Sequence, residues 1–219
     1  QAYLEACSGN PKKLSKALSE VKALGYNIVP IDINKAGKAW SCVDDNSLMP
    51  SFLSCKGVGE AAVEEILENR PYSSIEDLFW DEEGKWKHAK FNKRAIESLI
   101  KIRAFDSLDC VGPEKAFQSY AHMHTVLMEN FNDIRKRTKK DPYRGKNNFI
   151  RALVESPRSE EWSFDALMNF EEELLGTINV EALLPKKFVK KMTEKNIHSL
   201  DDHNGREFYW FVLTKAIPK

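Results

Sequence analysis

Two glycines two residues apart constrain the fold of this chain more than any other feature. Gly57 and Gly59 interrupt the stretch FLSCKGVGEAAVEEIL at residues 52–67, between an apolar segment opened by Pro50 and a helical pattern ended by Pro71. In that pattern the apolar side chains recur at the spacing of one helix face, namely Val58, Ala62, Val63, Ile66 and Leu67. Glycine lacks a Cβ and adopts positive φ readily, so it allows a tight turn. The stretch therefore predicts two closely packed helices joined by a short turn.

The turn also has the chemistry of a phosphate site. Its backbone N–H groups are expected at the N-terminus of the second helix, where unpaired donors and the helix dipole favour an anion. Lys56 adds a positive charge. A GxG turn that holds a sugar-phosphate backbone without reading the bases is typical of the helix-hairpin-helix motif. We therefore predict DNA contacts at Lys56, Gly57, Val58 and Gly59.

Two observations limit this interpretation. The same glycines would be needed for a sharp turn that serves only the packing of two helices. The helix after the turn also carries four carboxylates that would repel DNA, at Glu60, Glu64, Glu65 and Glu68. The DNA interpretation therefore requires this acidic face to point away from the bound duplex.

Composition excludes several classes of protein. With 219 residues and 42% hydrophobic content, the chain predicts a folded, soluble protein. No apolar run approaches the roughly 18 residues needed to cross a bilayer, and the first residues lack a signal peptide, so we expect no membrane contact and no export. The cysteines are too far apart for a CxxC metal pair or a compact disulfide framework, and they are Cys7, Cys42, Cys55 and Cys110. We therefore expect reduced thiols in a cytoplasmic protein without a metal site.

The charge distribution points to one local patch. The chain has 33 basic and 33 acidic residues, so any nucleic-acid contact has to come from local patches or backbone groups. Residues 132–151 form a basic block, with candidate contacts at Arg135, Lys136, Arg137, Lys139, Lys140 and Arg144. Phe131, Tyr143 and Phe149 could stack on unpaired bases beside it. The alternative is a solvated, flexible linker.

Hydrophobic periodicity along the rest of the chain predicts a mainly α-helical fold with a few short strands. Helices are expected at 10–25, 73–82, 90–108, 113–130, 163–176 and 181–197, the last interrupted by Pro185. An edge strand or irregular segment is expected at 27–34 because it contains Pro30, a turn-rich stretch at 35–47, and a strand at 206–218. The start, QAYLEACSGN, has no Met and enters a helical pattern directly, which we expect of a piece of a longer chain.

The order of four segments resembles the C-family replicative DNA polymerases of bacteria and phages, the DNA polymerase III alpha subunits. The segments are ALSEVKALGYNIVPIDIN, LMPSFLSCKGVGEAAVEEILENRPYSSIEDLF, KFNKRAIESLIKIRAFDSLD and FEEELLG. In that family a helix leads into a PDIN-like segment, which is followed by a KGVGE hairpin, an NRR.LE.LI..GAFD segment and an E.ELLG segment. The similarity covers residues 2–109 well and 166–176 more thinly.

The resemblance implies a tandem helix-hairpin-helix region that holds the double-stranded DNA leaving a polymerase active site, without sequence preference. It divides the chain into a distal fingers segment at 1–47, the tandem helix-hairpin-helix module at 48–110, a helix and basic linker at 111–165, and a C-terminal helical segment leading into a strand at 166–219, where the family's OB-fold begins. A sliding clamp docks on this region in the family and is a candidate partner. The family's catalytic aspartates, which use Mg, lie on the palm, so the resemblance implies a nucleotidyltransferase whose catalytic residues and cofactor are not in this chain.

The second hairpin departs from the family pattern. DNA contacts are implied at Asn92, Lys93, Arg94 and Arg103. Arg103 stands where the family usually has glycine, so it either supplies a side-chain contact to DNA or belongs to a hairpin kept for packing. No clamp-binding pentapeptide is evident between 111 and 165, and QSYAHM at 118–123 is a poor candidate. His122 and His124 are two residues apart, which places them on different sides of a helix and argues against a metal site.

Two other functions fit the same residues. A free-standing helix-hairpin-helix protein for DNA binding or repair would use the same turn. A protein-interaction module would use the same helices without contacting DNA. Duplex affinity measured against salt concentration separates the protein-interaction module from both DNA-binding alternatives, because phosphate contacts give a negative slope that scales with their number.

Overall fold

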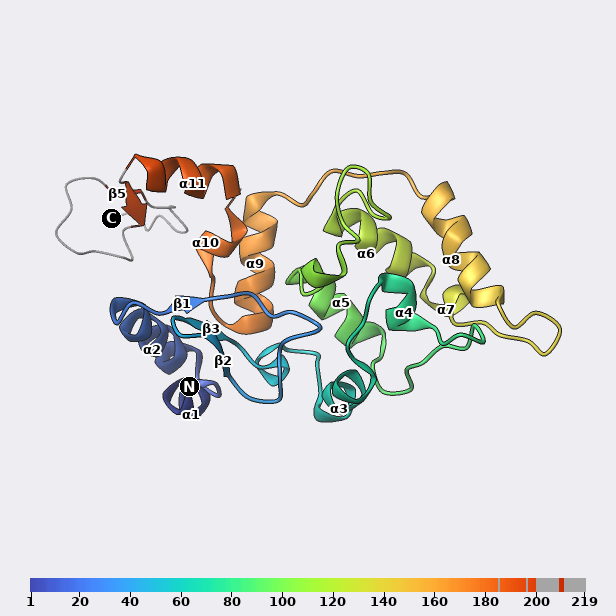
Figure 1. Cartoon of the computed structure of the whole chain (residues 1–219), viewed down its shortest axis with the longest axis horizontal. Helices are drawn as coiled ribbons and strands as arrows, with labels where there is room; N and C mark the ends of the chain where they lie inside the picture. Colours follow the sequence, from blue (N-terminus) through green and yellow to red (C-terminus); the bar gives the residue numbers. More distant parts are fainter. Residues whose placement is uncertain (185, 196, 200–208, 211–219) are drawn as a thin grey trace, which may run out of the picture.

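The computed structural model describes residues 1–184, 186–195, 197–199 and 209–210, and it confirms the mainly α-helical fold with a few short strands (Figure 1). The helices are α1 (Ala2–Cys7), α2 (Pro11–Ala23), α3 (Glu60–Asn69), α4 (Ile75–Phe79), α5 (Lys93–Lys101), α6 (Tyr120–Glu129), α7 (Phe131–Ile134), α8 (Arg144–Glu155), α9 (Phe164–Leu175), α10 (Val180–Leu183) and α11 (Lys186–Glu194). Single turns of 3-10 helix are η1 (Phe52–Ser54) and η2 (Asp106–Leu108). The strands are β1 (Asn27–Ile28), β2 (Ser41–Asp44), β3 (Ser47–Met49), β4 (His198–Ser199) and β5 (Tyr209–Trp210). Among the described residues, no helix has the length and apolar character needed to cross a membrane.

Helix α2 shows how local signals position an element. The Asn10 side-chain oxygen accepts hydrogen bonds from two N–H groups of the first turn, each at 3.1 Å, and Pro11 is the first helical residue. Gly25 follows the last turn with a φ of 89°, which suits glycine. The apolar face packs against α1 and Trp40, and its buried members are Leu14, Ala17, Leu18 and Val21. The predicted helix is therefore confirmed together with both of its ends.

A small sheet lies beside α2. Its strand order is β1-β3-β2, with β1 parallel to β3 and β2 antiparallel to β3. Strand β1 is an edge strand of two residues that ends before Pro30, as expected from a residue that cannot donate to a sheet. The β2–β3 hairpin lies in and just after the stretch that was predicted to be only turn-rich. The sequence signal for it is weak because the two strands have four and three residues.

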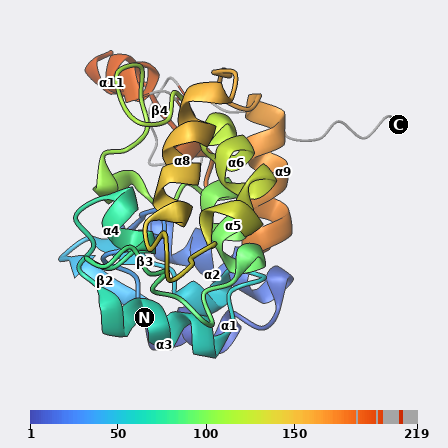
Figure 2. The same ribbon diagram turned by 90° about the vertical axis from the view of Figure 1, so that its right-hand side faces the viewer.

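One main hydrophobic core extends from Ile31 to Leu174 and joins the hairpin region to the later helices. Helix α5 contacts both α6 and α9, and α6 contacts α8 in turn (Figures 1 and 2). Ile96 and Leu99 on α5 are fully buried in this core. The predicted segments 48–110 and 111–165 therefore pack as one body, while the four segment boundaries stay predictions.

The helix predicted before the glycine turn is shorter than expected. Only the single turn η1 forms, and Ser51 caps it by accepting a hydrogen bond from the N–H of Ser54 at 3.1 Å. The N–H of Lys56 then donates to the carbonyl of Leu174 at the end of α9, at 2.8 Å, instead of continuing a helix. Contact with a distant element thus ends this helix after one turn.

Two other expectations also change. The helix predicted from 113 begins only at Tyr120, where the hydroxyl oxygen of Ser119 accepts from the N–H of His122 at 3.0 Å. The residues before it form a bridge between Val111 and Phe117, which removes them from a helical path. Of the strand predicted at 206–218, Tyr209–Trp210 pair with β4 as β5, and the other residues lie outside the described part of the chain.

Candidate nucleic-acid interface

Gly57 is required by both the conformation and the packing of the turn. Its φ is 94°, a region that side chains rarely adopt. A Cβ at this position would lie 2.6 Å from the Ser98 Oγ and 3.3 Å from the Arg94 Cγ, both on α5. Helix α5 therefore packs directly against the turn, and only glycine leaves room for that approach.

Gly59 has a different role, because it faces open space. It is the N-cap residue of α3 with an ordinary φ of −94°, and a Cβ there would meet nothing within 4 Å. The N–H groups of Gly57, Gly59, Glu60 and Ala61 donate to no protein acceptor within the described residues. Donors at the start of a helix point outward along its axis. The turn therefore presents a group of free donors to an open surface, as an anion requires.

Two exposed cations lie beside these donors. Lys56 belongs to the turn, and Arg94 reaches it from α5, with its Nε 3.4 Å from the Cβ position of Gly57. In the part of the chain that the structure describes, neither forms an ion pair with a carboxylate. The structure thus brings together residues predicted separately from the first and second hairpins. Their contact with DNA stays a prediction.

The other predicted contacts of this region have structural partners. Val58 is buried, and its N–H donates to the carbonyl of Cys55 at 3.2 Å. Asn92 caps α5 by accepting from the N–H of Ala95 at 3.1 Å. Lys93 donates through Nζ to the Met128 carbonyl at 2.8 Å and lies over the Phe131 ring. These residues position the turn and α5, and whether they also contact phosphate stays a prediction.

The acidic residues of α3 are partly neutralised. Glu65 turns away from the open surface and accepts hydrogen bonds from the N–H groups of Ala89, Lys90 and Phe91 at 2.7, 2.9 and 2.6 Å. Burial raises the pKa of Glu65, but these three bonds together with nearby His88 lower it more, and the pKa lies below its ordinary value. Glu64 pairs with Lys38 at 2.6 Å. Glu60 and Glu68 remain exposed, so part of the acidic face persists.

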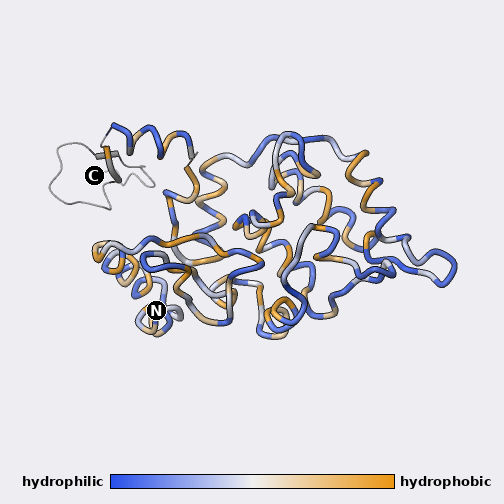
Figure 3. Tube along the Cα trace, viewed as in Figure 1, coloured by the Kyte–Doolittle hydropathy of each residue, from blue (hydrophilic) through white to orange (hydrophobic). Residues whose placement is uncertain are grey.

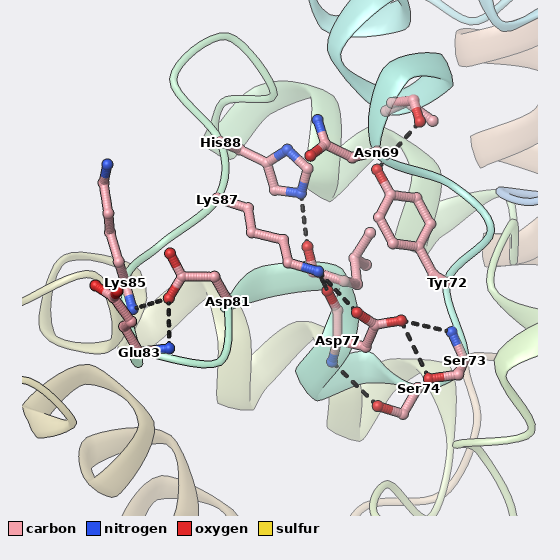
Figure 4. A network of polar contacts seen from close by, with 12 residues as sticks. Asn69, Tyr72, Ser73, Ser74, Asp77, Asp81, Glu83, Lys85, Lys87 and His88 are labelled. Carbon is pink, nitrogen blue, oxygen red and sulfur yellow. Dashed lines mark hydrogen bonds and ion pairs between the residues drawn. The ribbon is translucent and has the colours of Figure 1, made fainter.

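The segment after α3 is held by a polar network (Figure 4). His88 is buried, with its Nε2 2.6 Å from the Leu78 carbonyl oxygen and its Nδ1 3.5 Å from a Glu65 oxygen. Burial lowers the pKa of His88 below its ordinary value. Asp77 accepts from Lys87 Nζ at 2.7 Å and from the N–H and hydroxyl of Ser73. These contacts fix the chain between α3 and α5 and hence the position of α5 against the turn.

Replacing Glu65 with glutamine should lower the free energy of unfolding by about 2–3 kcal/mol at pH 7, because hydrogen bonds to a charged group contribute about 1.5–3 kcal/mol each and only part of this set is lost. The contribution of ionised Glu65 to the free energy of unfolding is present above its unfolded pKa of about 4.3 and disappears as the pH falls below that value. The difference in stability between the parent protein and Glu65→Gln should therefore shrink in acid. His88 should add a loss of stability in the parent protein as the pH falls from about 6.5, because the folded state resists its protonation.

Urea denaturation followed by circular dichroism at several pH values measures these differences. Glu68→Gln is the matched control, since Glu68 is an exposed residue of the same helix that forms no ion pair in the described part. Equal stability of Glu65→Gln and Glu68→Gln at pH 7 would contradict this role of Glu65.

Arg103 occupies the place of a helix-ending glycine. Its φ is 59°, its N–H donates to the Ile100 carbonyl, and the N–H of Ala104 donates to the Leu99 carbonyl, both at 2.9 Å. This is the hydrogen-bond pattern of a Schellman motif. The guanidinium is partly buried and donates to the carbonyl of Ala182 in α10. The geometry favours the packing alternative for this hairpin, and a DNA contact by Arg103 stays a prediction.

The basic block is not a featureless linker, because α7 and α8 enclose a hydrophilic loop at 135–143 (Figure 3). Phe131 and Phe149 are 4% and 1% exposed, so the prediction that they stack on bases is wrong, since the core covers them. Tyr143 is 47% exposed.

Three of the predicted cations have partners, namely Arg135 over the Trp86 and Phe131 rings, Lys136 with Asp133, and Arg137 with Glu83. Within the described chain no ion pair forms at the other three, Lys139, Lys140 and Arg144.

No group of three or more potential ligands for a metal ion occurs in the described residues. The Nδ1 of His122 accepts from the N–H of Gln118, and His124 lies 3.3 Å from Glu97, so the two rings have separate surroundings. Tyr120 in the QSYAHM segment is buried, and its hydroxyl donates to Asp106 at 2.8 Å. This burial agrees with the segment being a poor clamp-binding candidate.

The sequence does not reveal two features that shape this interface. Ser98 on α5 is small enough for the backbone of Gly57 to pack against it. In the sequence it is only a small residue on an otherwise apolar helix face. In the sequence Glu65 is one of four similar carboxylates after the turn, but in the structure its side chain accepts hydrogen bonds from the N–H groups of residues 89–91. Both roles come from contacts with residues that are distant in the chain, so the local sequence does not predict them.

Comparison with known proteins identifies relatives. The family model described as "Helix-hairpin-helix motif" matches residues 25–115. The DNA polymerase III subunit alpha of Borreliella burgdorferi is 32% identical over 180 residues, which is 76% of this chain and 14% of that protein. The same subunit of Campylobacter jejuni is 26% identical over 80% of this chain and 15% of its own length, and that of Escherichia coli is 27% identical over 80% and 14%. The chain thus spans about one seventh of the length of these relatives.

Proposed function

The chain is related to part of the DNA polymerase III alpha subunits and contains their helix-hairpin-helix motif, and from this we propose that it binds double-stranded DNA for a replicative polymerase. The observation that carries the proposal is the group of free N–H donors at Gly57, Gly59, Glu60 and Ala61. Lys56 and Arg94 lie beside these donors and would supply the charge that attracts phosphate.

The proposed contact is independent of sequence. Backbone N–H groups and two long cationic side chains suit phosphate oxygens, and such contacts carry no information about the bases. The inward turn of Glu65 and the pairing of Glu64 with Lys38 remove part of the repulsion that the sequence implied. A second contact is proposed at the loop 135–143 and the start of α8, through Lys139, Lys140 and Arg144.

The resemblance supplies the rest of the proposal. DNA synthesis, with its catalytic aspartates and Mg, is assigned to other parts of the intact polymerase, and a sliding clamp is proposed as a partner of that protein. The domain assignment at 48–110 as the DNA-binding module is part of the same proposal. A free-standing DNA-binding or repair accessory would use the same turn, whereas a protein-interaction module would not bind duplex.

Binding of this chain to a fluorescent duplex should weaken steeply between 50 and 200 mM salt, because neutralised phosphates release counterions. Replacing Lys56 or Arg94 with glutamine should each make the log-log slope less negative by about 0.9, the contribution of one phosphate contact. Fluorescence anisotropy at several salt concentrations measures both quantities.

Lys12→Gln is the control, since Lys12 is an exposed lysine in the first turn of α2 and not part of the turn at 56–59. It should leave the slope unchanged. Absence of salt-dependent binding would favour the protein-interaction module and contradict the proposal. An unchanged slope in both Lys56→Gln and Arg94→Gln would place the DNA elsewhere on the chain.

A further inference from the structure

A cavity of about 290 Å³ lies between α2, the segment 28–31 and the turn from α9 to α10. It is separate from the free donors of the glycine turn, none of which belongs to its lining. Its walls combine apolar and polar side chains, with Leu18, Ile31, Trp40 and Ile178 among the apolar ones. Apolar walls with a few convergent polar groups are typical of sites for small molecules.

A buried carboxyl group lines this cavity. Glu171 on α9 is only 6% exposed, and one of its oxygens, Oε2, accepts a hydrogen bond from the N–H of Asn179 at 2.6 Å. The other oxygen, Oε1, has no hydrogen-bond partner among the described residues. The Asn179 side chain donates to the Ile28 carbonyl at 2.7 Å and so joins two walls of the cavity. One oxygen of Glu171 is therefore held by Asn179, and the other is a free acceptor.

Two positive charges lie near Glu171, but within the described residues neither forms an ion pair with it. Burial raises its pKa, and the hydrogen bond from the N–H of Asn179, together with the positive charges of Arg103 and Lys22, opposes this, so that the pKa is about 7. Lys22 comes from α2 and lines the cavity, whereas Arg103 donates to the Ala182 carbonyl. In the described chain neither forms an ion pair with Glu171. A buried carboxylate is costly unless a charged or hydrogen-bonding group compensates it.

We propose that this cavity binds a small apolar molecule that carries one ammonium group, with the ammonium donating to Oε1 of Glu171. A guanidinium or a nucleobase edge binds a carboxylate best through both oxygens, whereas an ammonium needs only Oε1, which is the oxygen that does not already accept from Asn179. The apolar part would contact the walls around Leu18 and Ile178. The volume is near the lower limit of ligand pockets, so the expected ligand has roughly ten non-hydrogen atoms.

The experiment uses 2-phenylethylamine as the probe and 2-phenylethanol as its neutral counterpart. Both are titrated into the whole ¹⁵N-labelled chain at pH 8, and amide chemical shifts are followed by NMR. The amine should shift the signals of Asn179 and Leu18 saturably and bind about tenfold more tightly than the alcohol, as expected for a charged hydrogen bond. Equal affinities of the two probes, or no shifts with the amine, would overturn the proposal.

Glu171→Gln and the pH dependence provide the matched tests. The variant should lose about tenfold in affinity for the amine and bind the alcohol as before. In the parent chain the affinity for the amine should rise from pH 6 to pH 8 as Glu171 loses its proton, while the affinity for the alcohol stays constant. The pH series needs no variant, so it decides the question even where Glu171→Gln fails to fold. If the affinity for the amine changed neither with Glu171→Gln nor with pH, Glu171 would be excluded as the partner of the ammonium.

Discussion

Replacing Gly59 with valine should weaken duplex binding about tenfold or more while the chain stays folded. The valine side chain would project into the open space through which a phosphate has to approach the N–H groups of Gly59, Glu60 and Ala61. A hydrogen bond to a charged group contributes about 1.5–3 kcal/mol, which sets the scale of the loss. Because a Cβ at Gly59 meets nothing within 4 Å, stability should fall by no more than about 1 kcal/mol, the cost of a poorer N-cap residue.

Gly9→Val is the matched control for this substitution. A Cβ at Gly9 also meets nothing within 4 Å, and Gly9 lies in the turn between α1 and α2. Fluorescence anisotropy with a duplex and thermal denaturation should show lost affinity with near-normal stability for Gly59→Val, and neither effect for Gly9→Val. Unchanged affinity of folded Gly59→Val would mean that the turn serves packing and that DNA does not approach it.

Replacing Gly57 with alanine should instead lower the free energy of unfolding by about 2–5 kcal/mol. A left-handed backbone costs a side chain roughly 1–2 kcal/mol, and overpacking adds about 1–3 kcal/mol. The overpacking is specific, because the new Cβ would lie 2.6 Å from the Ser98 Oγ. Chemical denaturation followed by circular dichroism measures the loss.

Ser98→Ala separates the two causes. Combined with Gly57→Ala, it removes the Oγ that the new Cβ would meet and should recover the steric part of the loss, leaving the backbone part of about 1–2 kcal/mol. Additive effects of the two substitutions would contradict the close contact between the turn and α5. The two glycines thus test different things: Gly57 tests the packing of the turn, and Gly59 tests its access to phosphate.

Local signals in the sequence predicted much of the fold. Ser163 and Gly176 bound α9 as expected, with the Ser163 hydroxyl oxygen accepting from the N–H of Ala166 and Gly176 at a φ of 71°. Helix α10 ends at Leu183 and α11 begins at Lys186, so the helical pattern predicted for 181–197 is interrupted near the proline of the sequence. Caps, breakers and periodicity act over a few residues, so the chain itself carries this information.

Distant contacts account for the errors. The predicted helix before Gly57 stops after one turn because Lys56 donates to Leu174, more than a hundred residues away in the chain. Phe131 and Phe149 at the basic block are covered by the core, since Trp80 packs on Phe149 and Trp86 on Phe131. Composition could not predict either outcome, because a basic stretch has the same composition whether its aromatic residues are buried or exposed.

By itself the sequence determined the mainly helical fold, the glycine turn and the relationship to DNA polymerase III alpha subunits, because these depend on residue types at short spacings. Only the tertiary structure decided which glycine serves packing and which faces solvent, that Glu65 turns inward, and that Glu171 borders a cavity. Those features depend on the approach of elements that are far apart in the chain. The physical reason is that space around a residue is set by its neighbours in the fold and not by its neighbours in the sequence.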